Sequence, residues 1–190
     1  MSSKEHLLTK FLEYFGEESN DALFIQSVLD TLNFDNDIKV LDIGTGRGIM
    51  ASILGINGFE VITGEPAGAN WGDWEDLVEK LNLESKVKFR PLRAELLPFR
   101  DDLFDAVFLY TSFHHIDELL RLDTIKESVR VLKQGGYLVV IELNEDGVEN
   151  VRKKYPSHQS AVDPRDYTNF LRLDFKIIRG KYLDAYLCRI

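Results

Sequence analysis

The chain of 190 residues contains a single cysteine, Cys188, and no long apolar run. One cysteine excludes an intrachain disulfide and a metal site built from several cysteines, and it suits a reducing compartment. No stretch approaches the roughly 18 apolar residues of a membrane span. The N-terminal sequence Met-Ser-Ser-Lys-Glu-His lacks the apolar core of a signal peptide. We therefore expect a cytoplasmic protein with no membrane partner and no bound metal.

Positive charge is also scarce, because 23 lysines and arginines face 32 aspartates and glutamates, for a net charge of −9. An acidic chain is repelled by a phosphate backbone, so no DNA partner is expected and RNA is disfavoured. The hydrophobic fraction of 44% is ordinary for a globular protein. This length fits one domain over residues 1–190.

Strand and helix patterns alternate along the middle of the chain, which predicts a parallel sheet built from right-handed βαβ units. Strands are expected at 38–43, 59–65, 86–91, 104–110 and 136–143, and helices at 47–56, 71–81, 117–132 and 145–154. Gly135-Gly136 is interpreted as a helix stop. Two further strands, 173–179 and 182–188, joined at Gly180-Lys181, predict a C-terminal hairpin. The predicted fold is α/β: a Rossmann-like, doubly wound sheet of about seven strands, mostly parallel, with helices on both faces.

Two helices are expected before this core, which begins at residue 38. The first, over 3–15, places Phe11 and Phe15 on an apolar face, and Gly16 ends it. The second is capped by Ser19 or Asn20 and runs to Leu32. Its expected inner face comprises Leu23, Phe24, Val28 and Leu29. Residues 1–35 are predicted to form a lid over the core of residues 38–190.

The most informative stretch is the apolar run that ends in Asp42 and is followed by Gly44, Gly46 and Gly48. Strand, glycine turn and helix bring bare backbone against a nucleotide-like ligand. A dinucleotide fingerprint needs a small residue at position 49, where this chain has Ile49, and no phosphate-loop Gly-Lys-Ser/Thr is present. A carboxylate at Asp42 suits a cationic ligand.

The pattern Asp-x-Gly-x-Gly-x-Gly resembles the first motif of class I S-adenosylmethionine-dependent methyltransferases, and the resemblance to the type-11-like group extends over about 38–143. Glu65, at the end of the second strand, resembles the carboxylate that accepts the two ribose hydroxyls, although NAD sites use the same residue type. The resemblance implies S-adenosyl-L-methionine as cofactor. The residues that it implies for the cofactor site are Asp42, Gly44, Thr45, Gly46, Gly48, Glu65, Ala94, Glu95 and Tyr110.

The adenine-binding segment departs from the family pattern, because Arg93 stands where the group has an aspartate in Arg-Ala-Glu-Leu-Leu-Pro-Phe. An aspartate accepts the adenine amino proton, whereas an arginine has no acceptor. Arg93 is instead expected to stack on the adenine or to pair with Glu95.

Candidate acceptor-side residues follow the fourth strand. His114 and His115 are expected to open the next helix, and either could act as a general base for an acceptor that must lose a proton. The alternative is that both rings pack structurally. Tyr110 shapes the acceptor pocket or belongs to the core. Trp71 and Trp74 either line the ligand site or are partly buried at a helix start. Partial burial at a helix start is the favoured interpretation.

The function predicted from the sequence is methyl transfer from S-adenosylmethionine to a small-molecule acceptor, which needs alignment more than a catalytic triad. Methylation of a protein or RNA is a second interpretation. A third is a regulatory or partner subunit that binds the cofactor without transferring a methyl group. A homodimer is compatible with each of these.

Overall fold

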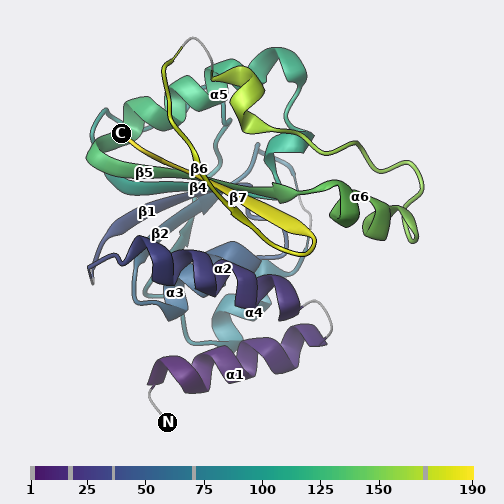
Figure 1. Cartoon of the computed structure of the whole chain (residues 1–190). Helices are drawn as coiled ribbons and strands as arrows, with labels where there is room; N and C mark the ends of the chain where they lie inside the picture. Colours follow the sequence, from purple (N-terminus) through teal and green to yellow (C-terminus); the bar gives the residue numbers. More distant parts are fainter. Residues whose placement is uncertain (1–2, 17–18, 36, 70–71, 169–170) are drawn as a thin grey trace. The chain divides into compact units, whose positions relative to one another are not determined.

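The structure is a computed structural model that describes residues 3–16, 19–35, 37–69, 72–168 and 171–190 (Figure 1). The chain divides into two compact units, Met1–Pro91 and Leu92–Ile190. Each unit alternates strands and helices, as the sequence predicts. The organisation of residues 1–190 as one domain stays a prediction. No helix in the described ranges is long and apolar enough to cross a membrane.

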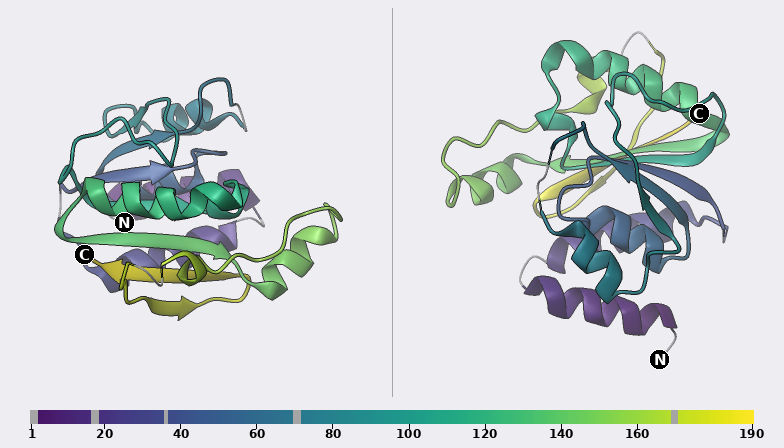
Figure 2. Two further views of the ribbon diagram at one scale, coloured as in Figure 1. Left: turned by 90° about the horizontal axis from the view of Figure 1, so that it is seen from above. Right: turned by 180° about the vertical axis from the view of Figure 1, so that it is seen from behind.

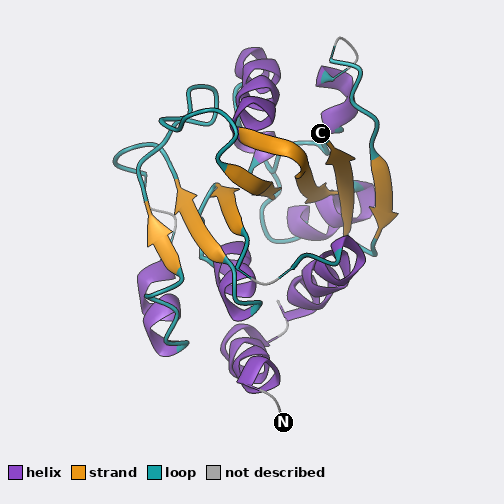
Figure 3. Cartoon of the chain, turned by 90° about the vertical axis from the view of Figure 1, so that its left-hand side faces the viewer, coloured by secondary structure: helices purple, strands orange, loops and turns teal. Residues whose placement is uncertain are grey.

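The first unit holds three parallel strands in the order β3-β2-β1. Its elements are α1 (Ser3–Phe15), α2 (Ser19–Leu32), β1 (Lys39–Ile43), α3 (Ile49–Ile56), β2 (Glu60–Gly64), α4 (Trp74–Lys80) and β3 (Val87–Phe89). Strand β3 is shorter than the predicted 86–91. In α3 every residue from Met50 to Ile56 is buried, because this helix lies between β2 and the helices α1 and α2. Helix α3 is thus the core helix of this unit, and Figure 3 shows the helices and strands of the chain in separate colours.

The two N-terminal helices form at the predicted places, but one face of α2 was assigned wrongly. Phe11 and Phe15 of α1 are buried as predicted. Leu23 is 51% exposed, whereas Ala22 and Ile25 are fully buried together with Val28 and Leu29. Residues 22, 25 and 29 fall on one stripe at the helical period, and Leu23 lies about 100° away from that stripe.

The second unit holds four strands in the order β4-β5-β7-β6. Its elements are β4 (Phe104–Tyr110), η2 (Phe113–His115), α5 (Glu118–Val131), β5 (Leu132–Leu143), α6 (Glu145–Arg152), η3 (Pro164–Tyr167), β6 (Lys176–Arg179) and β7 (Leu183–Arg189). Strands β4 and β5 are parallel, and the predicted hairpin β6–β7 adds to β5 in antiparallel fashion. Figure 2 shows α5 running along β5 in the same unit.

The seven strands make a mixed sheet that is parallel apart from its two C-terminal strands, which confirms the predicted fold class.

The main correction to the sequence-based prediction concerns Gly135-Gly136, which was interpreted as a helix stop. Helix α5 already ends at Val131, and the glycine pair lies within β5 beside a register shift between Phe104 and Ala106. Gly135 has φ +82°, and a Cβ on Gly136 would lie 2.9 Å from the Asp105 and Lys133 carbonyl oxygens. The pair therefore forms an irregularity in the strand and does not stop the helix.

Candidate cofactor and acceptor sites

The glycine turn after β1 has the backbone geometry that its sequence predicts. Gly44, Gly46 and Gly48 have φ values of +97°, +50° and +77°, a region that L side chains rarely adopt. A Cβ on Gly46 would meet no atom within 4 Å, so open space lies beside the turn. A Cβ on Gly48 would lie 2.9 Å from the Cβ of Trp74. The third glycine is therefore required by the packing of α4 against α3.

A chain of polar side chains joins the turn to β2. Thr63 donates a hydrogen bond to Asp42 at 2.8 Å, and the hydroxyls of Thr45 and Thr63 are 2.8 Å apart. Asp42 is fully buried, and its Oδ1 has no hydrogen-bond partner among the described residues. Burial raises the pKa of Asp42 to about 7; the hydrogen bond from Thr63 opposes this rise and the charge of Glu65 adds to it. A buried carboxyl oxygen without a hydrogen-bond partner at this position suits a ligand that brings a hydrogen-bond donor or a positive charge.

Glu65 follows β2 directly, and its carboxylate accepts a hydrogen bond from the Gly46 backbone N–H. The side chain also lines a cavity of about 310 Å³ within the first unit. Trp74 and Phe89 form a second wall, with stacked rings whose centroids are 5.4 Å apart. The site thus places a carboxylate and an aromatic surface around one space, which suits a nucleoside.

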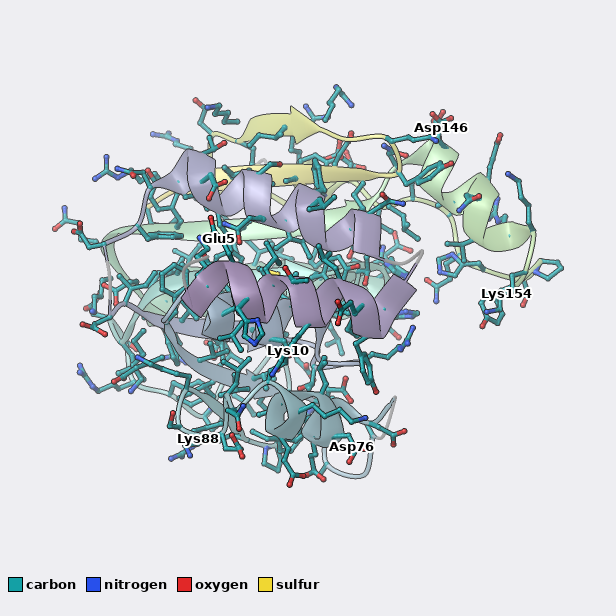
Figure 4. All side chains as sticks on the ribbon, turned by 90° about the horizontal axis from the view of Figure 1, so that it is seen from below. Glu5, Lys10, Asp76, Lys88, Asp146 and Lys154 are labelled. Carbon is teal, nitrogen blue, oxygen red and sulfur yellow. The ribbon has the colours of Figure 1, made fainter. Side chains whose placement is uncertain are left out.

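Trp74 is partly buried at the start of α4, the interpretation that the sequence favoured, and it also lines this cavity. Trp71 lies outside the described residues. The cavity is rimmed by carboxylates, and Figure 4 shows that Asp76 of α4 points outward from the first unit. Its acidic rim favours a ligand that carries positive charge.

The predicted adenine segment of the second unit forms a tight turn. Residues Arg93 and Leu96 make an isolated bridge, and the Leu96 N–H donates to the Arg93 carbonyl at 3.1 Å. Arg93 pairs with Glu95, its Nε lying 2.7 Å from the carboxylate, which is one of the two alternatives that the sequence left open. Ala94 is buried at the centre of this turn. The Glu95 carboxylate is therefore engaged by the residue that replaces the family's aspartate.

Tyr110 ends β4 and is partly exposed, and Thr111 follows with φ +45°. The sequence predicted that His114 and His115 begin the next α-helix, and this prediction was wrong. They lie in the 3₁₀ turn η2, and α5 begins only at Glu118, where Asp117 caps the helix by accepting from the Leu119 N–H at 2.9 Å. Asp117 is the stronger N-cap residue, which explains the later helix start.

His114 makes a contact that sequence reasoning missed. Its Nδ1 lies 2.6 Å from Glu142 Oε2, and both side chains are almost fully buried. The other carboxylate oxygen of Glu142 accepts the Phe113 backbone N–H at 2.7 Å. The sequence did contain one indication of this contact. Glu142 is an acidic residue near the end of the apolar run of β5, and a buried carboxylate needs a hydrogen-bond partner.

His115 is exposed, and its ring centroid lies 4.1 Å from that of His114. His158, from the segment after α6, brings a third ring 5.1 Å from His114. Partial burial of its ring and the neighbouring His114 lower the pKa of His115, although Glu142 opposes them. Within the described ranges, no group of three or more His, Cys, Asp or Glu side chains is arranged to hold a metal ion.

A parallel α/β architecture with a glycine turn after β1 and a carboxylate after β2 defines a class of proteins that bind nucleoside cofactors. Within that class, residues 41–140 match the methyltransferase domain family. The chain belongs to this family, in the type-11 group of class I S-adenosylmethionine-dependent methyltransferases.

Curated relatives include a demethylmenaquinone methyltransferase of Clavibacter sepedonicus, 32% identical over 126 residues. That alignment covers 66% of this chain and 49% of the relative. A ubiquinone/menaquinone biosynthesis C-methyltransferase of Citrobacter koseri is 28% identical over 134 residues, which cover 66% of this chain and 51% of the relative. The chain thus spans about half the length of the curated relatives it matches.

Solved structures share the fold. A SAM-dependent methyltransferase from Aquifex aeolicus superposes with a TM-score of 0.66 at 21% identity, covering 87% of this chain and 88% of that one. A protein from Pyrococcus horikoshii gives a TM-score of 0.76 at 18% identity and covers 92% of both chains. The likeness establishes the same Rossmann-like architecture.

Proposed function

We propose that this chain transfers a methyl group from S-adenosyl-L-methionine to a small-molecule acceptor. The observation that carries the proposal is the turn at Gly44 to Gly48 beside Glu65, whose carboxylate lines a cavity with an aromatic wall. When bound, the sulfonium donor supplies a methyl carbon already activated for displacement. The chain's residues then need to align the acceptor and exclude water, which can lower a barrier by about 7–11 kcal/mol.

The residues proposed for the donor have separate tasks. Glu65 accepts hydrogen bonds from the ribose hydroxyls, and the bare backbone of Gly44 and Gly46 allows close approach. Asp42, with its unpaired buried oxygen, offers an acceptor to the cationic end of the donor. Thr45 links the turn to Asp42 through Thr63. The roles that the family resemblance implies for Ala94, Glu95 and Tyr110 in donor binding stay predictions.

Helix α1 is proposed to act as part of a lid. The guanidinium of Arg47, in the glycine turn, lies 5.0 Å from the ring centroid of Phe15, and Lys80 lies 4.8 Å from the ring centroid of Tyr14. These contacts join the C-terminal end of α1 to the turn and to α4. Movement of α1 would therefore alter access to the turn.

The names of the relatives, which refer to menaquinone and ubiquinone, make a quinone-type ring the first acceptor class to test. The decisive assay incubates the full chain with labelled donor and a panel of phenolic, amine and thiol acceptors. Mass spectrometry then follows formation of the demethylated donor and the methylated product. We expect turnover with at least one small acceptor. Donor binding without transfer to any of them would favour the regulatory-subunit alternative.

A further inference from the structure

Three of the chain's four histidines gather in the second unit. His114 is 3% exposed, and the rings of His115 and His158 lie 4.1 Å and 5.1 Å from it between centroids. They come from two places in the chain, since His114 and His115 follow β4 and His158 follows α6. Figure 1 shows the segment after α6 projecting beyond the end of β5 before it returns.

Glu142 fixes the hydrogen-bonding state of His114. Its Oε1 accepts the Phe113 N–H at 2.7 Å, and its Oε2 lies 2.6 Å from His114 Nδ1. An ionised carboxylate only accepts, so Nδ1 carries a proton, and in the neutral form of the ring the lone pair then lies on Nε2. The backbone at His114 is held as well, because Arg121 donates to its carbonyl at 3.1 Å. The ring is thus oriented from two sides.

The Nε2 atom of His114 is buried and has no hydrogen-bond partner among the described residues. An unsatisfied buried acceptor costs about 1–3 kcal/mol. A group retained at that cost indicates a ligand that brings a proton donor to it. An acidic O–H group is such a donor.

We propose that His114 Nε2 is the general base for an acceptor with a phenolic or enolic O–H, and that Glu142 is its positioning residue. This rests on the proposed methyl transfer. The O–H proton moves to Nε2, and the oxyanion, or the ring carbon that it activates, forms the new bond to the methyl carbon. The electron pair of the broken carbon–sulfur bond stays on sulfur. After attack through carbon, the ring regains aromaticity by losing its C–H proton to solvent.

The groups around His114 favour this role. Glu142 from β5 stabilises the imidazolium that forms, while Arg121 from α5 binds the backbone carbonyl. Partial burial and the neighbouring His114 lower the pKa of His115, which disfavours a second charged ring beside His114. The ring of His158 lies 5.1 Å from that of His114 between centroids and belongs to the segment after α6.

The first test reads the tautomer directly in the full chain, without donor or acceptor. Long-range proton–nitrogen spectra of ¹⁵N-labelled protein distinguish Nδ1–H from Nε2–H in each histidine. Single His→Gln variants assign the signals, and exposed His6 is the reference. Wild type should show the proton of His114 on Nδ1. In Glu142→Gln the Phe113 N–H holds the amide oxygen, so the amide NH₂ faces Nδ1 and the proton should move to Nε2.

The second test measures turnover with matched phenolic, amine and thiol acceptors, together with calorimetry of donor binding. His114→Gln should lower turnover of the phenol by roughly a hundredfold or more, and Glu142→Gln by at least about tenfold, with donor affinity unchanged. Asp184→Asn is the matched control, because Asp184 pairs with Glu142 in register across β7 and is also buried but bonds Arg179 and Asn144. The Asp184→Asn variant should show the same tautomer of His114 and the same turnover as wild type.

Three results would overturn the proposal: His114 with its proton on Nε2 in wild type, a folded Glu142→Gln variant with full turnover, or a clear preference for the amine or thiol. A chain that binds no methyl donor would overturn the proposed function instead, and calorimetry alone reveals that failure. The spectra still decide whether Glu142 sets the tautomer of His114.

Discussion

At the scale of single residues, Glu65 is the sharpest test of donor binding. Glu65→Ala should weaken binding of S-adenosylmethionine by on the order of 1.5–3 kcal/mol, the range for hydrogen bonds to a charged group. Glu65→Gln should lose less of this binding free energy, because one acceptor oxygen remains. Glu60→Gln, at the exposed start of the same strand, is the control. Wild-type affinity in both Glu65 variants, measured by calorimetry, would place the ribose elsewhere.

Asp42 predicts a pH dependence of stability. Its folded pKa of about 7 lies above its ordinary value of 3.8 because the carboxyl is buried. The folded state therefore binds more protons than the unfolded state between those values, and stability falls as pH rises from about 4 to about 7. The shift corresponds to at most about 4 kcal/mol.

Asp42→Asn removes this titration, so the stability of the variant relative to wild type should rise steadily between pH 4 and pH 7. Urea unfolding at several pH values provides the measurement. Parallel stability curves for the two proteins over that range would contradict the raised pKa.

Gly46 tests the turn itself. Gly46→Val should abolish donor binding, since a branched side chain would occupy the open space beside the turn and resists φ +50°. Gly58→Val is the matched control, because Gly58 also has positive φ and an open Cβ position but lies in the turn before β2. Both variants should lose similar stability, and only Gly46→Val should lose binding. Equal donor affinities in the two folded variants would show that this turn is not the site.

At the scale of elements, a substitution in the irregular part of β5 should lower the free energy of unfolding more than a substitution at an exposed position of the same strand. Gly136→Ala would place a Cβ 2.9 Å from two carbonyl oxygens, so β4 and β5 must shift locally. We expect a loss of about 1–3 kcal/mol in the free energy of unfolding, whereas Gln134→Ala on the exposed part of the same strand should change little. Denaturant unfolding measures both, and equal midpoints would show that the strands absorb the extra atom.

At the scale of the whole molecule, the glycine spacing predicts which nucleoside cofactor stabilises the fold. S-adenosylmethionine or its demethylated product should raise the melting temperature, since a ligand at a hundred times its Kd adds about 2.7 kcal/mol. NAD at the same concentration should have little effect, because Ile49 stands where a dinucleotide fingerprint needs a small residue. Thermal scans with each ligand check this. A larger shift with NAD would reverse the assignment of the cofactor.

The sequence by itself determined the order of strands and helices, the glycine turn with Asp42 and Glu65, and the family, because these depend on local periodicity and on spacing within short segments. Single positions were less predictable. Leu23 was assigned to the wrong face, and Gly135-Gly136 lies in a strand because contacts with β4, remote in the sequence, set its conformation.

Only the tertiary structure decided which polar groups meet. Glu142 and His114 are 28 residues apart, and no local pattern predicts that the end of β5 brings a buried carboxylate to η2. The same holds for Trp74, whose packing makes Gly48 obligatory and whose stacking on Phe89 gives the cavity its aromatic wall. Such pairs depend on where strand ends converge, which is a property of the folded sheet and is not encoded in any short stretch of the chain.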